Sequence, residues 1–362
     1  MTSKIRKAYG YRLSVEGPVM IRENPTQSAP SLSVVLSFRD EEENIPELLG
    51  RLRKTLGTEC ERGHLSRYEL IFVNDDSRDR SLELLMEAAR GNDDIRIVTM
   101  ARNFGVTPCV LAGMDYSSGD LIAYMDADLQ DPPELLSEML EAWRRQGNPD
   151  VIHTVRRSRA GEGLFKLALT RLGYWILRSI SAVPIRMEAG DFKLLSRRTV
   201  NELRRLREKK PFMRGLVAWV GFRQIEILYD RQPRFAGKTK FRAGGIKVIR
   251  NFLESALISF SDVPLHLATA AGVFISLASF LGLIYVAIGK VFDLNVPGWT
   301  GIMMAVLFLG GVQLLFMGLM GLYIHAIFLE VKDRPNYVIE STFGFPESVR
   351  ETDAAVRSIH TE

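Results

Sequence analysis

The sequence predicts an α/β protein in which a mostly parallel, doubly wound sheet is anchored to a membrane by a hairpin of two helices. Between residues 31 and 155, short apolar runs alternate with amphipathic helical segments, a pattern typical of parallel sheets that carry helices on both faces. In the C-terminal third, no side chain carries a formal charge from Leu265 to Gly289 or from Leu294 to Leu329. Each of these stretches exceeds the about 20 residues that cross a bilayer core.

The α/β body begins with residues 31–38 (SLSVVLSF), an apolar run typical of a strand that is buried on both faces. The helix that follows has one apolar stripe and a cap formed by Asn44 and Glu47. A helix bearing Leu82 and Leu85 comes next, and further helices are expected near 106–116 and from about 132. The remaining expected strands are residues 68–74, 95–101, 121–125 and 150–155.

The two uncharged stretches predict a transmembrane hairpin, joined by the turn KVFDLNVPGW. Lysine and arginine flank the hairpin on both sides, and only Lys290 lies in its turn. The positive-inside rule therefore places both ends in the cytoplasm, and we expect a multi-pass protein of the cytoplasmic (inner) membrane. Small residues in the second helix permit close contact between chains, and so a homo-oligomer: Gly310, Gly311, Gly318 and Gly321.

These patterns divide the chain into five parts. They are a polar N-terminal tail (1–30), the α/β domain (31–243), a juxtamembrane amphipathic helix (244–263), the transmembrane hairpin (264–330) and a cytoplasmic C-terminal tail (331–362). A further amphipathic helix is expected within the α/β domain, at about 164–180. Basic amphipathic helices of this kind lie in the headgroup layer of a bilayer. Packing on the core of the body is the alternative for both helices.

Composition narrows the class of protein. The net charge is only +4, but lysine and arginine cluster between Arg156 and Arg250, which indicates a surface for phosphates, an anionic membrane or nucleic acid. The two cysteines, Cys60 and Cys109, have neither metal-ligand spacing nor a disulfide framework. No G-x-G-x-x-G follows a strand, which disfavours a dinucleotide-dependent dehydrogenase.

Acidic residues follow three of the expected strands, in the stretches 40–43, 75–76 and 126–128. Ligands of doubly wound sheets bind beyond the carboxyl ends of the strands, so we expect the three stretches to share one site. In AYMDADLQDPPE, the alternation of an extended chain places Asp126, Asp128 and Gln130 on one face. Their oxygens suit Mg²⁺ or Mn²⁺. Asp131 and Glu134 instead match an N-cap and its capping-box partner.

Several stretches together resemble glycosyltransferase family 2, in particular its polyisoprenyl-phosphate glycosyltransferases, the group that includes dolichol-phosphate mannose synthases and bactoprenol glucosyltransferases. The similarity extends from about residue 31 to residue 337. The stretches are VVLSFRDEEENIPEL, FVNDDSRD, ARNFG, YMDADLQDPPE, AGDFKLLSR, FMRGLVAWVGF and RFAGKTKF. The resemblance implies a GT-A catalytic domain at 31–243.

The resemblance also implies residues that bind the sugar donor, a nucleotide diphosphosugar. Ser37, Arg39 and Glu41 occupy the family's first nucleoside-binding turn, where its proline and tyrosine are absent. Asp75 lies at the position of the base-binding aspartate, and Asp76 replaces a glycine that usually follows. Asp126 is implied near the ribose and the metal, while Asp128 and Gln130 hold the cation.

Basic residues are implied for the phosphates, because guanidinium groups match phosphate geometry. Arg156 and Arg159 are implied to hold the lipid phosphate, and Arg234, Lys238 and Lys240 lie on a loop suited to the diphosphate. Asp191 aligns with an aspartate proposed as the catalytic base. A phosphate monoester has a second pKa near ~6, so Asp191 could instead orient the acceptor or the sugar.

The implied reaction is inverting, metal-dependent transfer of a sugar from a nucleotide diphosphosugar to undecaprenyl phosphate at the cytoplasmic membrane face, for cell-envelope or glycan modification. The spelling of the motifs favours a UDP-hexose such as UDP-glucose, and the alternative is a mannose synthase that uses GDP-mannose. A processive polysaccharide synthase is disfavoured because no Q-x-x-R-W occurs. A non-catalytic membrane scaffold leaves the acidic strand ends unexplained.

Overall fold

A computed structural model describes residues 28–156, 189–206, 208–230, 272–275, 277–278, 281 and 298–346. The first part contains β1 (Ser31–Phe38), α1 (Ile45–Glu61), β2 (Arg67–Asn74), α2 (Ser81–Ala89), β3 (Ile95–Met100), α3 (Val106–Tyr116), β4 (Leu121–Asp126), α4 (Leu135–Arg145) and β5 (Val151–Arg156). The later parts contain β6 (Ala189–Ser196), α6 (Arg197–Arg205), α7 (Met213–Trp219), β7 (Gln224–Tyr229), α10 (Trp299–Lys332) and β8 (Ile339–Phe343).

The strands form one eight-stranded sheet in the order β7-β5-β6-β4-β1-β2-β3-β8. Parallel pairs join β1 to β2 and β4, β2 to β3, and β5 to β7. Antiparallel pairs join β6 to β4 and β5, and β8 to β3. The predicted α/β class is therefore confirmed, and the sheet is mixed because β6 and β8 run against the other strands.

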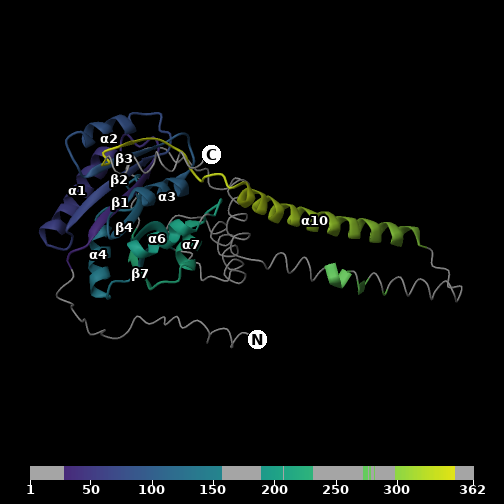
Figure 1. The fold of residues 1–362 in the computed structure, drawn as a ribbon. Helices are drawn as coiled ribbons and strands as arrows, with labels where there is room; N and C mark the ends of the chain where they lie inside the picture. Colours follow the sequence, from purple (N-terminus) through teal and green to yellow (C-terminus); the bar gives the residue numbers. More distant parts are fainter. Residues whose placement is uncertain are drawn as a thin grey trace.

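Helices cover both faces of the sheet, as Figure 1 shows. One apolar cluster joins α1, α2 and α4 to strand residues such as Leu36 and Phe72. The other joins α3, α6 and α7 to the alternate strand residues, including Val35 and Tyr124. Because neighbouring strand residues point to opposite faces, β1 and β4 contribute side chains to both clusters. This explains why residues 34–36 of β1 and 121–125 of β4 are apolar without interruption.

The second uncharged stretch forms α10, which leaves the body and runs away from the sheet (Figure 1). Phe308–Lys332 has the length and composition of a membrane span, and none of its most apolar window is buried within the protein. A helix of a soluble core would be covered, whereas the described side chains of α10 are mostly exposed. Most of the first predicted span, and both predicted amphipathic helices, lie outside the described residues.

The segment predicted as a C-terminal tail returns to the body. β8 pairs with β3 at the edge of the sheet, and the hydroxyl of Tyr337 donates a hydrogen bond to Asp115 of α3. Phe345 is buried, with its ring 5.0 Å from that of Tyr116 and the Arg96 guanidinium 5.4 Å above it. The chain after α10 is thus part of the folded domain.

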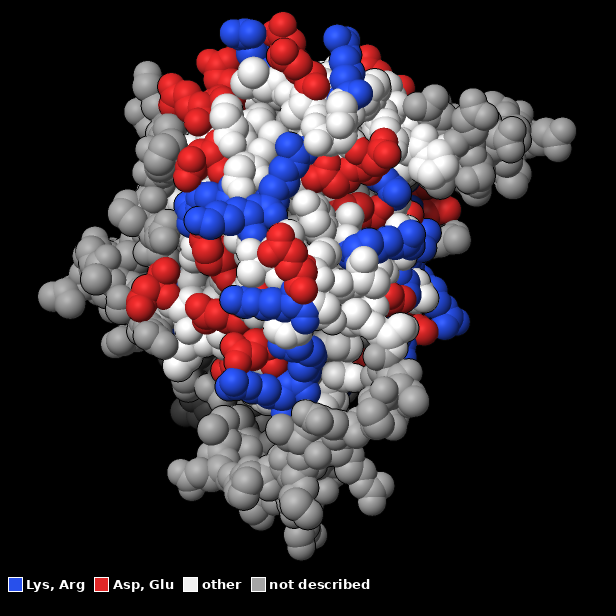
Figure 2. All heavy atoms as spheres, turned by 90° about the vertical axis from the view of Figure 1, so that its left-hand side faces the viewer, with Lys and Arg blue, Asp and Glu red and all other residues white. Residues whose placement is uncertain are grey.

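The face that carries α1, α2 and α4 is turned away from α10 (Figure 1). Figure 2 shows positive and negative side chains interspersed over the described part of this face. Several are paired, as in the contacts of Arg51 with Glu134 at 2.6 Å and of Arg53 with Asp94 at 3.0 Å. Mixed charge of this kind gives solubility and no strong field of one sign.

Candidate active site

The carboxyl ends of β1, β2 and β4 lie side by side, because β1 pairs in parallel with both of the others. The backbone of Asp75 donates to the carbonyl of Phe38 at 3.0 Å, and that of Ala127 donates to the carbonyl of Ser37 at 3.3 Å. The Ser37 hydroxyl donates to Asp126 Oδ1 at 3.3 Å. Three residues predicted to bind the nucleotide therefore lie together at the carboxyl ends of these strands: Ser37, Asp75 and Asp126.

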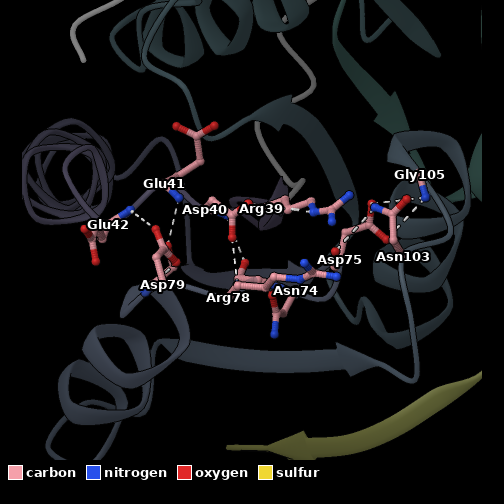
Figure 3. A network of polar contacts seen from close by, with 12 residues as sticks. Arg39, Asp40, Glu41, Glu42, Asn74, Asp75, Arg78, Asp79, Asn103 and Gly105 are labelled. Atoms are coloured by element: carbon pink, nitrogen blue, oxygen red, sulfur yellow. Dashed lines mark hydrogen bonds and ion pairs between the residues drawn. The ribbon is translucent and has the colours of Figure 1, made fainter. Parts of the chain in front are cut away.

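The turns after β1 and β2 interlock at this edge, as Figure 3 shows. The amide of Asp40 donates to the Ser77 hydroxyl at 3.1 Å, and Asp40 Oδ1 accepts from the amide of Arg78 at 2.7 Å. The amide of Glu42 donates to Asp79 Oδ2 at 3.1 Å. Asp40 and Asp79 thus accept from backbone amides that the turns would otherwise leave unpaired. Within the acidic stretch 40–43, Asp40 and Glu42 therefore make hydrogen bonds that hold the two turns together.

Glu41 and Arg39 leave the same turn in different directions (Figure 3). Glu41 is nearly buried, and its Oε2 accepts from Asn44 Nδ2 at 2.5 Å. The predicted cap of α1 by the Asn44 side chain is therefore wrong, because no side-chain cap bond forms at that helix start. The guanidinium of Arg39 extends toward Asp75 (Figure 3). A donor role for either residue stays a prediction.

Asp75 holds the loop between β3 and α3. Its carboxylate accepts from the Phe104 amide at 2.7 Å, from the Gly105 amide at 3.0 Å and from Asn103 Nδ2 at 2.6 Å. The residue is only 6% exposed. These bonds fix the ARNFG loop against the end of β2 (Figure 3). The base of a nucleotide that approached Asp75 would therefore also contact this loop.

Three non-glycine residues in the turns of this edge have left-handed backbones: Asp40 (φ 48°), Asp76 (φ 62°) and Leu129 (φ 57°). The conformation costs about 1–2 kcal/mol for a residue with a Cβ. Asp76 adopts the geometry that a glycine supplies freely, and Leu129 interrupts the D-x-D-x-Q stretch. Strain of this kind is concentrated at functional sites.

The extended alternation predicted for Asp126, Asp128 and Gln130 is wrong, since β4 ends at Asp126 and a bent segment with left-handed Leu129 follows. Asp128 is nearly buried, and its Oδ1 accepts from the Gln130 amide at 3.2 Å. Burial, together with the charges of Asp128, Asp191 and Asp131, raises the pKa of Asp126 to about 7. The charge of Asp128 thus still acts on Asp126 despite the bend.

These carboxylates fit a hard divalent cation. The raised pKa of Asp126 means that its ionised form is disfavoured in this site, and a cation would stabilise that form. Mg²⁺ binds through one or two carboxylates, with water and phosphate oxygens completing its shell. Within the described residues, no three acidic, histidine or cysteine side chains are already arranged around a common metal position. Asp126 and Asp128 therefore fit a site that a nucleotide diphosphate would complete.

Asp131 and Glu134 do not cap α4 as predicted, because the helix starts at Leu135 and has no side-chain cap bond. Glu134 accepts from Arg51 Nε at 2.8 Å and from Arg51 Nη2 at 2.6 Å. Asp131 is buried and accepts from the Tyr229 hydroxyl, which also accepts from Arg156 Nε at 3.4 Å. Tertiary partners thus replace the local capping box for both acids.

Asp191 lies on β6 and is paired with Arg214 of α7. Arg214 Nε donates to Asp191 Oδ1 at 2.8 Å, and Arg214 Nη2 donates to Oδ2 at 2.6 Å. Burial opposes ionisation of Asp191, but Arg214 outweighs it and lowers the pKa to about 2. A carboxylate with so low a pKa is a weak base, so its orienting role is favoured over proton removal.

Lys193 follows Asp191 on the same face of β6 and is 1% exposed. Its Nζ donates to the Gly190 carbonyl at 2.6 Å and lies 5.4 Å from the centre of the Tyr124 ring. Burial lowers its pKa to about 8. Lys193, Arg214 and Tyr229 were not predicted as site residues, although Lys193 and Arg214 occur in the quoted AGDFKLLSR and FMRGLVAWVGF stretches.

Of the predicted phosphate-binding residues, the structure describes Arg156, the last residue of β5. The others lie outside the described residues: Arg159, Arg234, Lys238 and Lys240. Their roles stay predictions.

Comparison with known proteins gives a consistent assignment. The sequence pattern of glycosyl transferase family 2 matches residues 33–204. The uncharacterized glycosyltransferase YkcC of Bacillus subtilis is 39% identical, with 86% of this chain and 94% of that protein covered. The uncharacterized glycosyltransferase sll0501 of Synechocystis is 40% identical, with 86% and 96% covered. The SfII prophage-derived bactoprenol glucosyl transferase of Shigella flexneri is 35% identical, with 86% and 98% covered.

Proposed function

This chain belongs to glycosyl transferase family 2 and is a glycosyltransferase, and from that premise we propose that it transfers a hexose from a UDP-sugar to a polyisoprenyl phosphate at the cytoplasmic face of a membrane. The observation that carries the proposal is the 35% identity to a bactoprenol glucosyl transferase over 98% of that protein. The 314 matched residues exceed the α/β domain (31–243), so the similarity also includes part of the chain beyond that domain.

The donor binds at the edge formed by β1, β2 and β4. Asp75 and the loop at residues 103–105 face the base, with Arg39 extending toward them (Figure 3). Ser37 and Asp126, which share a hydrogen bond, lie one strand further along and face the ribose and diphosphate. The shared edge of these residues supports this order along the nucleotide.

A divalent cation, Mg²⁺ or Mn²⁺, is held by Asp126, Asp128 and Gln130 in this proposal. When bound, it neutralises charge on the departing diphosphate. The raised pKa of Asp126 supports the assignment, since burial and the charges of Asp128, Asp191 and Asp131 disfavour its ionised form, and a bound cation would stabilise that form. Arg234, Lys238 and Lys240 would add positive charge on the acceptor side of the diphosphate.

The acceptor phosphate is held by Arg156 and Arg159. One of its oxygens attacks the anomeric carbon of the sugar, a new carbon–oxygen bond forms, and the bond to the diphosphate breaks with its electron pair leaving on UDP. The configuration at the anomeric carbon inverts. Because the phosphate is already ionised above its second pKa near ~6, no proton has to be removed, and Asp191 with Arg214 orients the reactants.

We also propose the membrane arrangement expected from the sequence. The catalytic domain (31–243) lies in the cytoplasm beside the inner membrane, and the hairpin (264–330) spans it. The exposed apolar surface of α10 supports this arrangement, and Lys332 with Arg334 at its end supports a cytoplasmic C-terminus. An acceptor with a long isoprenoid tail requires the site to lie near the bilayer.

The test is a transfer assay with the full chain in membranes, supplied with undecaprenyl phosphate and a panel of UDP- and GDP-sugars, followed by mass analysis of the extracted lipid. We expect a lipid-phosphate hexose from UDP-glucose and product loss on chelation. Product from GDP-mannose alone would make the chain a mannose synthase. No lipid-linked sugar from any donor, with the protein folded and able to bind nucleotide, would refute the proposed acceptor.

A further inference from the structure

β5 and β7 end together at one side of the candidate site. They are parallel neighbours, and their last residues, Arg156 and Tyr229, are register partners. The chain after Arg156 contains Arg159, and the chain after Tyr229 contains the basic residues of RFAGKTK. Both segments proposed to bind phosphate therefore start from one pair of residues at the strand ends.

The hydroxyl of Tyr229 connects this pair to the D-x-D segment. It donates to Asp131 Oδ1 and accepts from Arg156 Nε at 3.4 Å. Asp131 is only three residues after Asp128. One hydroxyl therefore joins three parts of the fold: the segment that carries the proposed metal ligands, the arginine proposed to hold the acceptor phosphate, and the base of the basic loop.

The surroundings hold this hydroxyl in place. Tyr229 is 4% exposed and Asp131 is 3% exposed. On β6, a Cβ built at Gly190 would lie 2.9 Å from Thr154 Oγ1, which is too close, and 3.4 Å from the Tyr229 hydroxyl oxygen, which is ordinary contact. The bridge therefore lies in a closely packed region. Buried hydrogen bonds to a charged group are stronger than exposed neutral ones.

We propose that Tyr229 is a positioning residue that fixes the distance between the donor segment (126–131) and the acceptor arginine, Arg156. The proposal rests on the proposed function, because it assigns Tyr229 a part in bringing a lipid phosphate to a nucleotide sugar. Tyr229 acts through Asp131 and Arg156 and touches neither reactant. Small displacements of reacting groups have large effects on rate, so loss of the bridge lowers turnover while donor affinity is kept.

Tyr229→Phe removes only the hydroxyl and keeps the buried ring. We expect kcat for transfer to undecaprenyl phosphate to fall about tenfold, the effect of one charge-assisted hydrogen bond. The Kd for UDP, measured by calorimetry, stays within about twofold, and the melting temperature in detergent stays close to that of the wild type. Tyr68→Phe is the matched control, because Tyr68 is a half-buried tyrosine at the start of β2, far from the carboxyl ends of the strands. We expect the Tyr68→Phe variant to have the same kcat as the wild type.

Asp131 variants separate positioning from a structural effect. Asp131→Asn keeps an oxygen that accepts from Tyr229 and retains most of the activity, whereas Asp131→Ala matches Tyr229→Phe. In the double variant Tyr229→Phe with Asp131→Ala, the loss is no greater than in the worse single variant, because both changes remove one bond.

Equal kcat values for Tyr229→Phe and Tyr68→Phe would overturn the proposal while leaving the proposed function intact. So would additive losses in the double variant, or a loss of activity that tracks a lowered melting temperature. A folded wild-type protein that forms no lipid-linked sugar would overturn both, so the two failures are distinguishable.

Discussion

Asp191→Asn tests whether this position supplies a base. The pair with Arg214 lowers the pKa of Asp191 to about 2, and the acceptor phosphate has a second pKa near ~6. The two pKa values differ by about four. Transfer of a proton from the phosphate to this carboxylate would then be unfavourable by roughly 5 kcal/mol, which is an equilibrium constant of about one in ten thousand. At pH 7.5 the phosphate has already lost that proton without help.

We therefore expect Asp191→Asn to lower kcat/KM only about tenfold, through misplacement of Arg214, which loses its ionic partner. The asparagine still accepts one hydrogen bond from the guanidinium. The assay is lipid-linked sugar formation between pH 5 and 8.5 for both proteins. Activity should rise with pH through about 6 in each, because the ionisation belongs to the acceptor and not to Asp191.

If Asp191→Asn lowered kcat/KM more than about a thousandfold and abolished the rise of activity near pH 6, this reasoning would be refuted. Asp191 would then be the general base. Arg214→Lys serves as a companion variant. It keeps the positive charge but loses the two-point contact with Asp191, so it should also lose activity moderately while its pH profile is unchanged.

Three further predictions concern the metal, a turn and the C-terminal segment. Asp128→Ala should reduce transfer at least about a hundredfold without lowering the melting temperature by more than a few degrees, and full activity at any Mn²⁺ concentration would contradict the ligand assignment. At Asp76 (φ 62°), glycine should be more stable than alanine by about 1 kcal/mol, seen as a higher melting temperature; equal stability would mean that the backbone relaxes. Phe345→Ala should destabilise the protein by about 3 kcal/mol, because the ring is buried against Tyr116 and Arg96; an unchanged melting temperature would show that the segment is bound only weakly.

The parallel core was legible in the sequence because its strands are buried on both faces and read as unbroken apolar runs. The rule holds for the apolar centres of three strands, which are residues 34–36 of β1, 70–73 of β2 and 121–125 of β4. β6 does not follow the rule, because Asp191 and Lys193 interrupt the strand with charges that are compensated only in the fold, by Arg214 and by the Gly190 carbonyl. β8 escaped prediction because its partner, β3, lies far away in the sequence.

The site predictions that rested on the order of the strands were correct, and those that rested on local capping motifs were wrong. Acidic residues at successive strand ends could be placed at one edge because parallel topology alone brings them together. Asn44 donates to nearby Glu41 instead of capping its helix. The caps by Asp131 and Glu134 failed because each side chain has a partner far away in the sequence, Tyr229 and Arg51. Local motifs carry no information about such partners.

The order of the strands has a mechanical consequence. Among the described strands, β7 is the last before the proposed membrane segment and forms one rim of the sheet, and β8 is the first after it and forms the opposite rim. A domain tethered by a single linker can swivel freely above a bilayer. In the proposed membrane arrangement the domain is attached at both rims, and two attachments resist rotation about the membrane normal and the lifting of either rim, so the site would keep a more constant orientation toward the lipid headgroups.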